Sequence, residues 1–300
     1  MTGLVEDAAE TIAAMMQRGG PRPDEYDGLT ELFNRIHAGV RSGELDSDKL
    51  GSLMDAFGES MSLGTVQGFG YRRPHGYAGD FEVIDRIYNQ WVSPYPHLAR
   101  WDHYFHSLPA PKAVRNRIPY LHRLLTEVVS RKPRARILDL GSGSGRSMFE
   151  WFKTHPETTV HFDCVEVDPN AIAFATELNR EFLDRVTFQK RNVFWFQPES
   201  QYDLIWSSGL FDYFEDAVFV SVGQQLFPAL EPGGEMVVGN FAPDNPQRAY
   251  METIGGWILK HREPDELVRL MILCGSAPEH VRVGAEPEGV NLFAHARRGS

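Results

Sequence analysis

The residues with the clearest chemical potential form a glycine-rich run, Asp139-Leu140-Gly141-Ser142-Gly143-Ser144-Gly145. The run follows an apolar segment with the composition of a short strand and precedes a stretch with helical spacing. Glycines in such a turn let the backbone bend tightly and approach a ligand. The helix that follows offers its unpaired N–H groups to polar ligand atoms. A tight turn without a ligand has the same composition, so the residues around the run must decide.

Two residues refine this interpretation. Position 146 is Arg, whereas the dinucleotide-binding fingerprint has glycine or alanine there. A nicotinamide-dependent oxidoreductase is therefore the less favoured alternative. Glu166 ends the next predicted strand, where its carboxylate can accept both hydroxyls of an adenosine ribose; the alternative is a solvated strand end. Asp168 either contacts the same ligand or caps a helix that begins at Pro169.

The elements that must position these residues alternate between strand and helix. Apolar strand segments at 135–140, 161–166, 186–189, 202–206 and 235–239 are separated by helical patterns, notably at 170–182 and 215–230. This alternation predicts a doubly wound, Rossmann-like α/β fold. A helical stretch at 246–274 and two further strands, at 279–284 and 290–296, suggest a seven-stranded, mostly parallel sheet that ends in an antiparallel hairpin.

The N-terminal part has a different texture. Helical spacing at 4–18, 28–41, 47–63, 81–92 and 112–130 alternates with loops, of which 64–80 is rich in glycine and aromatic residues. We therefore expect an N-terminal helical cap or substrate region over residues 1–130 and a cofactor-binding domain over 131–300.

The motifs resemble those of class I S-adenosylmethionine-dependent methyltransferases. The resemblance covers about residues 130–298 and rests on five segments in the order found in that class: 137–145, Val165-Glu166-Val167-Asp168, Arg191-Asn192-Val193, 202–209 and Leu230-Glu231-Pro232-Gly233-Gly234. It implies that S-adenosyl-L-methionine is the cofactor. The implied cofactor-binding positions are Asp139, Gly141, Ser142, Gly143 and Gly145 for the amino-acid end, Glu166 with Asp168 for the ribose, Asn192 and Val193 for adenine, and Ser207. Asn192 stands where an aspartate is common.

Candidate catalytic residues follow the fourth strand. Methyl transfer requires alignment of the reacting atoms and exclusion of water, and a hydroxyl or ammonium acceptor also benefits from a base. Asp212 or Tyr213 could orient or deprotonate the acceptor; alternatively, the aromatic residues pack in the core and Asp212 caps the helix from Glu215. Asn240, at the end of the fifth strand, is a candidate wall of the substrate site.

The segment 72–81 is unusually dense in polar, aromatic and glycine residues, which is typical of functional loops. We predict that it folds over the cofactor cleft and places Tyr77, a further candidate catalytic and cofactor-binding residue, near the sulfonium or the substrate. An aromatic face favours a cation such as the sulfonium. Arg72, Arg73, His75 and Asp80 would then contact the substrate. The alternative is a linker in which Asp80 caps the helix over 81–92.

The run Gly76-Tyr77-Ala78-Gly79-Asp80 also resembles a bacterial group of methyltransferases that make 3-hydroxypalmitic acid methyl ester. That resemblance implies methylation of a carboxylate, with Arg72, Arg73 or His75 as its partner.

Composition limits the remaining possibilities. A net charge of −11 without a basic cluster argues against nucleic acid as a partner. The two cysteines lie in apolar surroundings that suit a reducing compartment, and no segment has the features of a signal peptide or a membrane span, so we expect a cytoplasmic protein. Histidines lack metal-ligand spacing.

We predict methyl transfer to an oxygen or nitrogen of a small molecule; the alternative is a non-catalytic regulatory protein that binds the same cofactor. The helices of residues 1–60 could also pair two subunits into a homodimer.

Overall fold

The computed structural model describes residues 2–46 and 50–299 and divides the chain into two compact units. The first unit contains residues 1–112 together with 245–258, and the second contains 113–244 and 259–300. The division differs from the expected boundary near residue 130, because the helix α7 (Pro109–Arg131) leaves the first unit at its first turn. The segment 245–258 then returns to the first unit from the middle of the second.

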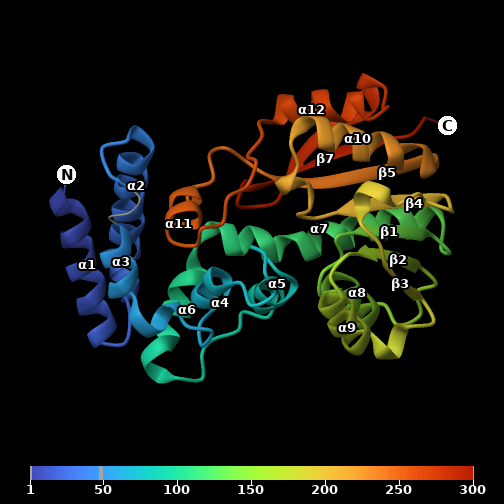
Figure 1. The fold of residues 1–300 in the computed structure, drawn as a ribbon. Helices are drawn as coiled ribbons and strands as arrows, with labels where there is room; N and C mark the ends of the chain where they lie inside the picture. Colours follow the sequence, from blue (N-terminus) through green and yellow to red (C-terminus); the bar gives the residue numbers. More distant parts are fainter. Residues whose placement is uncertain (1, 47–49, 300) are drawn as a thin grey trace. The chain divides into compact units, whose positions relative to one another are not determined.

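A seven-stranded sheet forms the centre of the second unit (Figure 1), and its strand order is β3-β2-β1-β4-β5-β7-β6. The strands are β1 (Arg136–Leu140), β2 (His161–Glu166), β3 (Val186–Lys190), β4 (Tyr202–Ser207), β5 (Leu230–Phe241), β6 (Val281–Ala285) and β7 (Asn291–Arg297). The first five pair in parallel, whereas β7 runs antiparallel to both β5 and β6. The predicted doubly wound sheet with a C-terminal hairpin is therefore confirmed.

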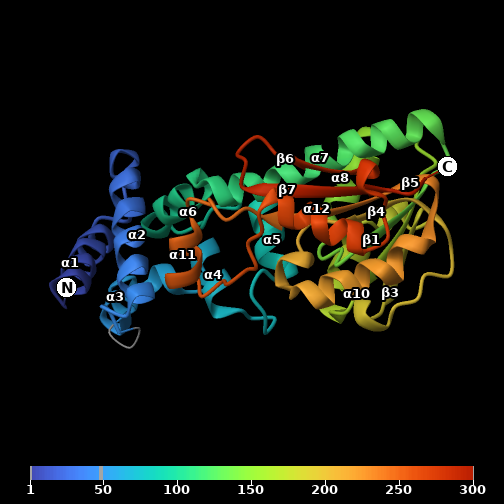
Figure 2. The same cartoon turned by 90° about the horizontal axis from the view of Figure 1, so that it is seen from above.

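Helices cover both faces of this sheet, because side chains of a strand alternate between its faces. Leu138 and Leu140 of β1 pack in one core with α10 (Asp216–Leu226) and α12 (Pro264–Leu273). Ile137 points to the other core, which it shares with α7 and α8 (Arg146–Thr154). Viewed along the sheet, α7 and α10 lie on opposite sides of the strands (Figure 2). The helix α9 (Pro169–Leu178), which connects β2 to β3, packs against both of these strands.

The first unit is helical. It contains α1 (Thr2–Gln17), α2 (Tyr26–Ser42), α3 (Gly51–Ala56), α4 (Val66–Arg72), α5 (Phe81–Tyr88), α6 (Pro96–Ser107) and α11 (Arg248–Thr253). The helix predicted over 47–63 is wrong in its length. Residues 47–49 lie outside the described residues, and the rest divides into α3 and a 3₁₀ turn (Gly58–Met61) that begins at Gly58, whose φ is +47°.

The prediction that 64–80 is entirely loop is also wrong, because its first half is α4. The Thr65 hydroxyl caps this helix by accepting the N–H of Gly68. Glycine is required at position 68, since a Cβ there would lie 2.1 Å from the carbonyl oxygen of Ser62. Within the described residues, no helix has both the length and the apolarity needed to span a bilayer.

Candidate active site

The glycine run leaves β1 and reaches the first turn of α8 in a conformation that only glycine adopts easily. Gly141, Gly143 and Gly145 have φ of +64°, +52° and +65°. Close packing adds a second requirement at two of them. A Cβ on Gly141 would lie 3.2 Å from the Cβ of Leu210, and one on Gly145 would lie 2.9 Å from the Nδ2 of Asn179. Glycine is therefore required at positions 141 and 145 by both the backbone conformation and the close packing.

Glu166, at the tip of β2, fastens this loop. One carboxylate oxygen accepts the N–H of Gly143 at 3.0 Å, and the other accepts the N–H groups of Val167 at 2.7 Å and Asp168 at 3.0 Å. The side chain is half-buried. Glu166 is thus not a solvated strand end, and its contact with a ribose stays a prediction.

The Asp168 carboxylate accepts the N–H of Asn170 at 2.8 Å and caps α9, so the capping role expected for it is observed. Asn192 has a comparable position after β3. Its side chain is exposed and caps a 3₁₀ turn, η5 (Val193–Trp195), by accepting the N–H of Phe194 at 3.0 Å. Val193 beside it is buried. The Ser207 hydroxyl is buried and donates to the carbonyl oxygen of Leu140 at 3.0 Å, which joins β4 to β1 directly before the glycine run.

Asp139 has a buried carboxylate without a partner. Its side chain is 4% exposed, and no described residue donates a hydrogen bond to it or neutralises it. Burial, and secondarily the negative charge of Glu166, raise the pKa of Asp139 to about 7. A buried carboxylate of this kind is costly unless a cation or a donor reaches it. The α-ammonium group of S-adenosylmethionine is such a cation, and the residues around the glycine run therefore fit this cofactor.

Asp212 lies at the carboxyl end of β4, in the 3₁₀ turn η6 (Phe211–Tyr213), and is 1% exposed. One carboxylate oxygen accepts the N–H of Phe241 at 2.7 Å, and the other lies 3.6 Å from Nη2 of Arg117. Burial raises the pKa of Asp212 to about 7, against the opposing effects of Arg117, the Phe241 N–H and Arg262. The alternative in which Asp212 caps α10 is wrong, because Glu215 occupies that position, and a catalytic role for Asp212 stays a prediction. Tyr213, next to it, is 43% exposed.

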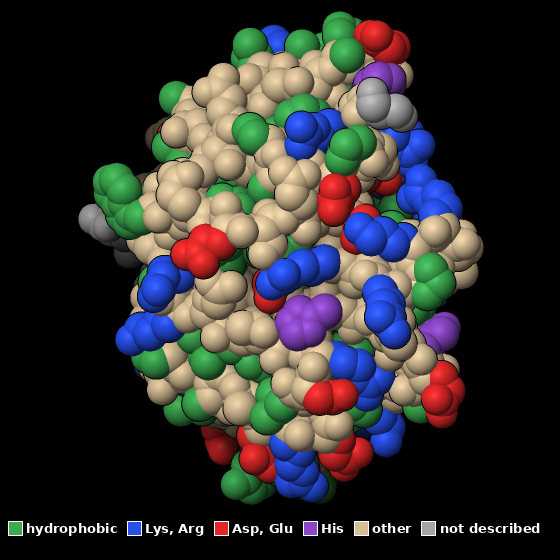
Figure 3. Space-filling view, turned by 90° about the vertical axis from the view of Figure 1, so that its right-hand side faces the viewer, with side chains coloured by type: hydrophobic (Ala, Val, Ile, Leu, Met, Phe, Trp, Pro, Cys, Tyr) green, Lys and Arg blue, Asp and Glu red, His purple; other side chains and the backbone are tan. Residues whose placement is uncertain are grey.

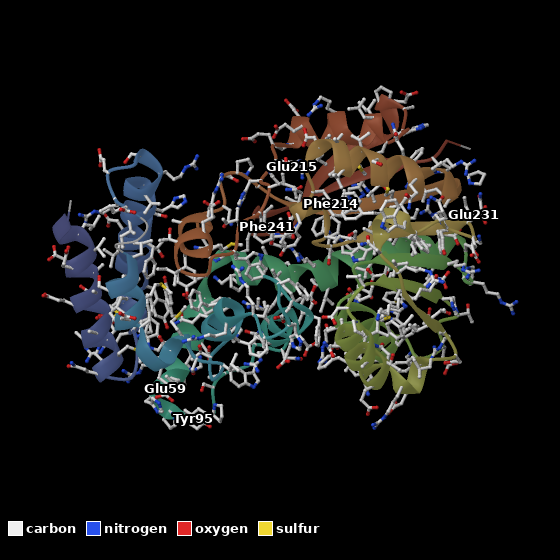
Figure 4. All side chains as sticks on the ribbon, viewed as in Figure 1. Glu59, Tyr95, Phe214, Glu215, Glu231 and Phe241 are labelled. Atoms are coloured by element: carbon white, nitrogen blue, oxygen red, sulfur yellow. The ribbon has the colours of Figure 1, made fainter. Side chains whose placement is uncertain are left out.

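Neighbouring polar residues complete this buried cluster. The Asn240 amide donates to the carbonyl oxygens of Lys260 and Phe241, and its oxygen accepts from Nη1 of Arg262 at 2.7 Å. The labelled residues Phe214, Glu215 and Phe241 mark the end of the sheet at which this cluster lies, and Glu231, at the start of β5, marks the opposite end (Figure 4). Open α/β sheets bind ligands at the carboxyl ends of their strands.

Arg117 and Arg262 are the residues that sequence reasoning missed. Both guanidinium groups are buried, at 6% and 4% exposure, and both lie within hydrogen-bonding or ionic reach of residues that follow β4 or β5. The one available signal was weak: Arg117 occupies a position on the buried face of α7, where the helical spacing calls for an apolar residue.

The polar residues of segment 72–81 have partners within the first unit. Arg72 donates to the carbonyl oxygen of Met61 at 2.8 Å, Arg73 donates to that of Gly256, and His75 lies 3.1 Å from the Glu82 carboxylate. Asp80 caps α5 by accepting the N–H groups of Glu82 and Val83, so the capping alternative is confirmed for this residue. Tyr77 is 40% exposed. The predicted approach of this segment to the cofactor stays a prediction.

No group of three or more His, Cys, Asp or Glu residues with metal-binding geometry occurs in the described ranges 2–46 and 50–299.

The sequence and the fold were compared with those of known proteins. Residues 131–268 match a family described as a methyltransferase domain. No curated protein sequence matches the chain. Among solved structures, a protein of Bordetella parapertussis described as a possible exported protein is 17% identical; the match covers 99% of this chain and 96% of that one, with a TM-score of 0.63.

Two further structures are similar over most of the chain. The S-adenosylmethionine-dependent methyltransferase SibL in its apo form is 16% identical, with 89% and 78% of the two chains covered and a TM-score of 0.52. The pyocyanin biosynthetic protein PhzM is 15% identical, with 88% and 68% covered and a TM-score of 0.54. At these identities the similarity shows the fold. The family match covers residues 131–268 and identifies this segment as similar to a methyltransferase domain.

Proposed function

We propose that the protein transfers a methyl group to an oxygen or nitrogen atom of a small-molecule acceptor held at the carboxyl ends of β4 and β5. The observation that carries this proposal is that two buried carboxylates lie toward the carboxyl ends of β1 and β4, which are neighbouring parallel strands. Asp139 is the second-last residue of β1, directly before the glycine run, and Asp212 lies in the turn that follows β4. The Asp139 carboxylate is suited to bind a cationic cofactor, and the Asp212 carboxylate is suited to accept a proton.

S-adenosylmethionine, when bound, supplies an activated methyl group on a sulfonium. The residues of this chain would bind and orient. Asp139 would face the ammonium group, Glu166 the ribose, and Asn192 with Val193 the adenine. The glycine run would let the backbone approach the methionine tail. Asp168, Ser142 and Ser207 would contribute through the loops that they stabilise or lie in, and Asn240 would form a wall of the acceptor site.

Asp212 would take the proton of a hydroxyl or ammonium acceptor. A base works best when its pKa lies near the working pH, and the pKa of about 7 meets that condition. Tyr213 would orient the same acceptor. A carboxylate acceptor is already ionised and would need no base, so the pH dependence of turnover separates the two kinds of acceptor.

A carboxylate acceptor is the more specific form of the proposal. The resemblance of segment 76–80 favours it. Arg72, Arg73 and His75 no longer support it, because each is engaged within the first unit. Tyr77 would cover the sulfonium. Unchanged cofactor affinity and turnover in both Tyr77→Phe and Tyr77→Ala would remove this residue from the site.

The decisive experiment measures binding and turnover separately. Calorimetry with S-adenosylhomocysteine should show binding at one site per chain. Incubation with methyl-labelled S-adenosylmethionine and a panel of small carboxylic acids, alcohols and amines should then yield a labelled product. Release of labelled methanol by mild alkali identifies a methyl ester, whereas N- and O-alkyl products survive. Binding without turnover on the whole panel would favour the non-catalytic regulatory alternative.

We also propose that the partner is a small molecule rather than nucleic acid. In the view of Figure 3, basic and acidic side chains are interspersed and hydrophobic ones are scattered. The acidic side chains that lie between the basic ones on this face would repel a phosphate backbone. The cytoplasmic location and a homodimer through residues 1–60 remain predictions, which cell fractionation and light scattering can test. The similar Bordetella protein is described as a possible exported protein, so fractionation should include the periplasm or medium.

A further inference from the structure

The two buried arginines of the second unit differ in how their donors are used. Every nitrogen of the Arg262 guanidinium donates a hydrogen bond within the protein. Nη1 donates to the carbonyl oxygen of Phe211 and to Oδ1 of Asn240. Nη2 donates to the carbonyl oxygen of Phe214, and Nε donates to the Asp216 carboxylate. Such an arginine is a structural connector between the loops that follow β4 and β5.

Arg117 is buried to a similar degree, but only one of its nitrogen atoms donates a hydrogen bond to a described residue. Its Nε donates to Oδ1 of Asn291 at 2.6 Å. Its nearest carboxylate, on Asp212, lies 3.6 Å from Nη2, which is beyond hydrogen-bonding distance. Among the described residues, none accepts a hydrogen bond from Nη1 or Nη2. A guanidinium has five N–H donors, and only Nε of Arg117 has a hydrogen-bond acceptor among the described residues.

The surroundings of Arg117 indicate where the missing acceptor lies. A Cβ on Gly209 would lie 2.7 Å from Nη1, and its three closest neighbours would all be guanidinium atoms of Arg117. Gly209 follows β4, and the next residue, Leu210, packs against Gly141 of the glycine run. The unused edge of Arg117 therefore lies between the cofactor loop and the Asp212 turn, at the carboxyl end of the sheet.

We propose that Arg117 binds a carboxylate group through Nη1 and Nη2. A planar guanidinium fits a carboxylate with two parallel hydrogen bonds, and Nη1 and Nη2 of Arg117 have no hydrogen-bond acceptor among the described residues. This inference rests on the proposed function for the source of the carboxylate, which is either the methionine tail of the cofactor or the acceptor molecule. Arg117 would thus take the role that the sequence suggested for Arg72, Arg73 or His75.

The first arm of the test addresses the cofactor as the source. Calorimetry compares S-adenosylhomocysteine with 5′-methylthioadenosine, which has the same adenosyl group and no carboxylate. For Arg117→Met we expect affinity for S-adenosylhomocysteine to fall at least about tenfold, the usual consequence of losing a charge-assisted bond, and affinity for methylthioadenosine to stay unchanged. Arg123→Met is the matched control, because Arg123 lies on the same helix and is exposed.

The second arm addresses the acceptor. Octanoate with octanamide, and benzoate with benzamide, are titrated into the protein with and without S-adenosylhomocysteine. If Arg117 binds the acceptor carboxylate, the wild type prefers the acids at least about tenfold, and Arg117→Met loses that preference while it keeps its nucleoside affinity. If Arg117→Met equals Arg123→Met in both arms, the proposal is overturned.

A second variant guards against loss of folding. Gly209→Ala keeps Arg117 and adds a methyl group that meets only its guanidinium among its closest neighbours, so it should reproduce the loss in the same arm. In the Arg117→Met background the same alanine should have no further effect, and an additive effect would contradict the proposal. If the wild type binds neither nucleoside, the proposed function fails, and the second arm without nucleoside still decides the carboxylate site.

Discussion

Nη2 of Arg117 lies 3.6 Å from a carboxylate oxygen of Asp212, and both side chains are almost completely buried. The pair is close enough for electrostatic attraction but too far apart for a hydrogen bond. The other carboxylate oxygen is held by the N–H of Phe241. Asp212 is therefore fixed in position while its proton affinity stays high, with a pKa of about 7.

This arrangement predicts the effect of Asp212→Asn. With a hydroxyl or amine acceptor, kcat of the wild type should rise with pH up to about 7 and then level off, because the base must be ionised. The variant should lose about 10²–10⁴-fold of kcat and lack this rise. Its affinity for S-adenosylhomocysteine should not change, since the amide oxygen can still accept the Phe241 N–H. Turnover within about threefold of the wild type would assign Asp212 a purely structural role.

Glu166 should control cofactor affinity through the loop that it fastens. Glu166→Ala removes the acceptor of three backbone N–H groups, those of Gly143, Val167 and Asp168. We expect affinity for S-adenosylhomocysteine to fall more than about tenfold by calorimetry, because charge-assisted bonds contribute about 1.5–3 kcal/mol each. Methylthioadenosine should lose affinity equally, since both ligands carry the ribose. Glu166→Gln keeps one acceptor oxygen and should lie between the two.

Asp139 should lower the stability of the ligand-free protein as pH rises. Its pKa is about 7 in the folded state and 3.8 in its unperturbed form, so between these values the unfolded chain releases the proton first and is favoured. Each unit of this difference corresponds to about 1.4 kcal/mol. The contribution to stability is therefore present at low pH and lost as pH rises through about 7.

Asp139→Asn tests this directly. Denaturant titrations at several pH values give the difference in unfolding free energy between the variant and the wild type. The variant should gain stability relative to the wild type from pH 4 to pH 8, by a few kcal/mol at most (on the order of the pKa difference). Other titrating groups act in both proteins and cancel. A difference that does not change with pH would show that the Asp139 carboxylate is not destabilised by burial.

Gly223 should be irreplaceable in the packing of α10 on α12. A Cβ at this position would lie 2.1 Å from Sγ and 2.8 Å from Cβ of Cys274, so Gly223→Ala forces the two helices apart. We expect a loss of about 1–3 kcal/mol in unfolding free energy. In a Cys274→Ala background the loss should be smaller, because the closest atom is gone. Equal losses in both backgrounds would contradict this packing argument.

The parts of the fold that were predictable depend on local sequence. The strands β1 to β5 were predictable because each is a short apolar segment that suits burial in a sheet. The glycine turn was predictable because glycine adopts positive φ easily, as observed at positions 141, 143 and 145. The helices α4 and α6 were not predicted. Glycines and prolines normally break helices, but here Gly68 permits a close approach to Ser62 and Pro96 stands in the first turn, where it is tolerated.

The candidate site was predictable only where a motif carried it. Glu166 and the glycine run stand at the ends of predicted strands. In contrast, Arg117 is held by a hydrogen bond to Asn291, which lies 174 residues further along the chain. Nothing near Arg117 in the sequence indicates that contact. The converse holds for Arg72 and His75. Their residue types suit a ligand, but their partners, Met61 and Glu82, lie in the same unit.

The excursion of residues 245–258 into the first unit has a practical consequence. The polypeptide passes between the two units after residues 112, 244 and 258, so no single cut separates them. A fragment that starts at residue 113 would carry α11 without α2, although the two helices pack together and His37 pairs with Glu252. The first unit is therefore complete only with residues 245–258, and a mutation that unfolds the first unit should leave this segment unpacked between two parts of the second.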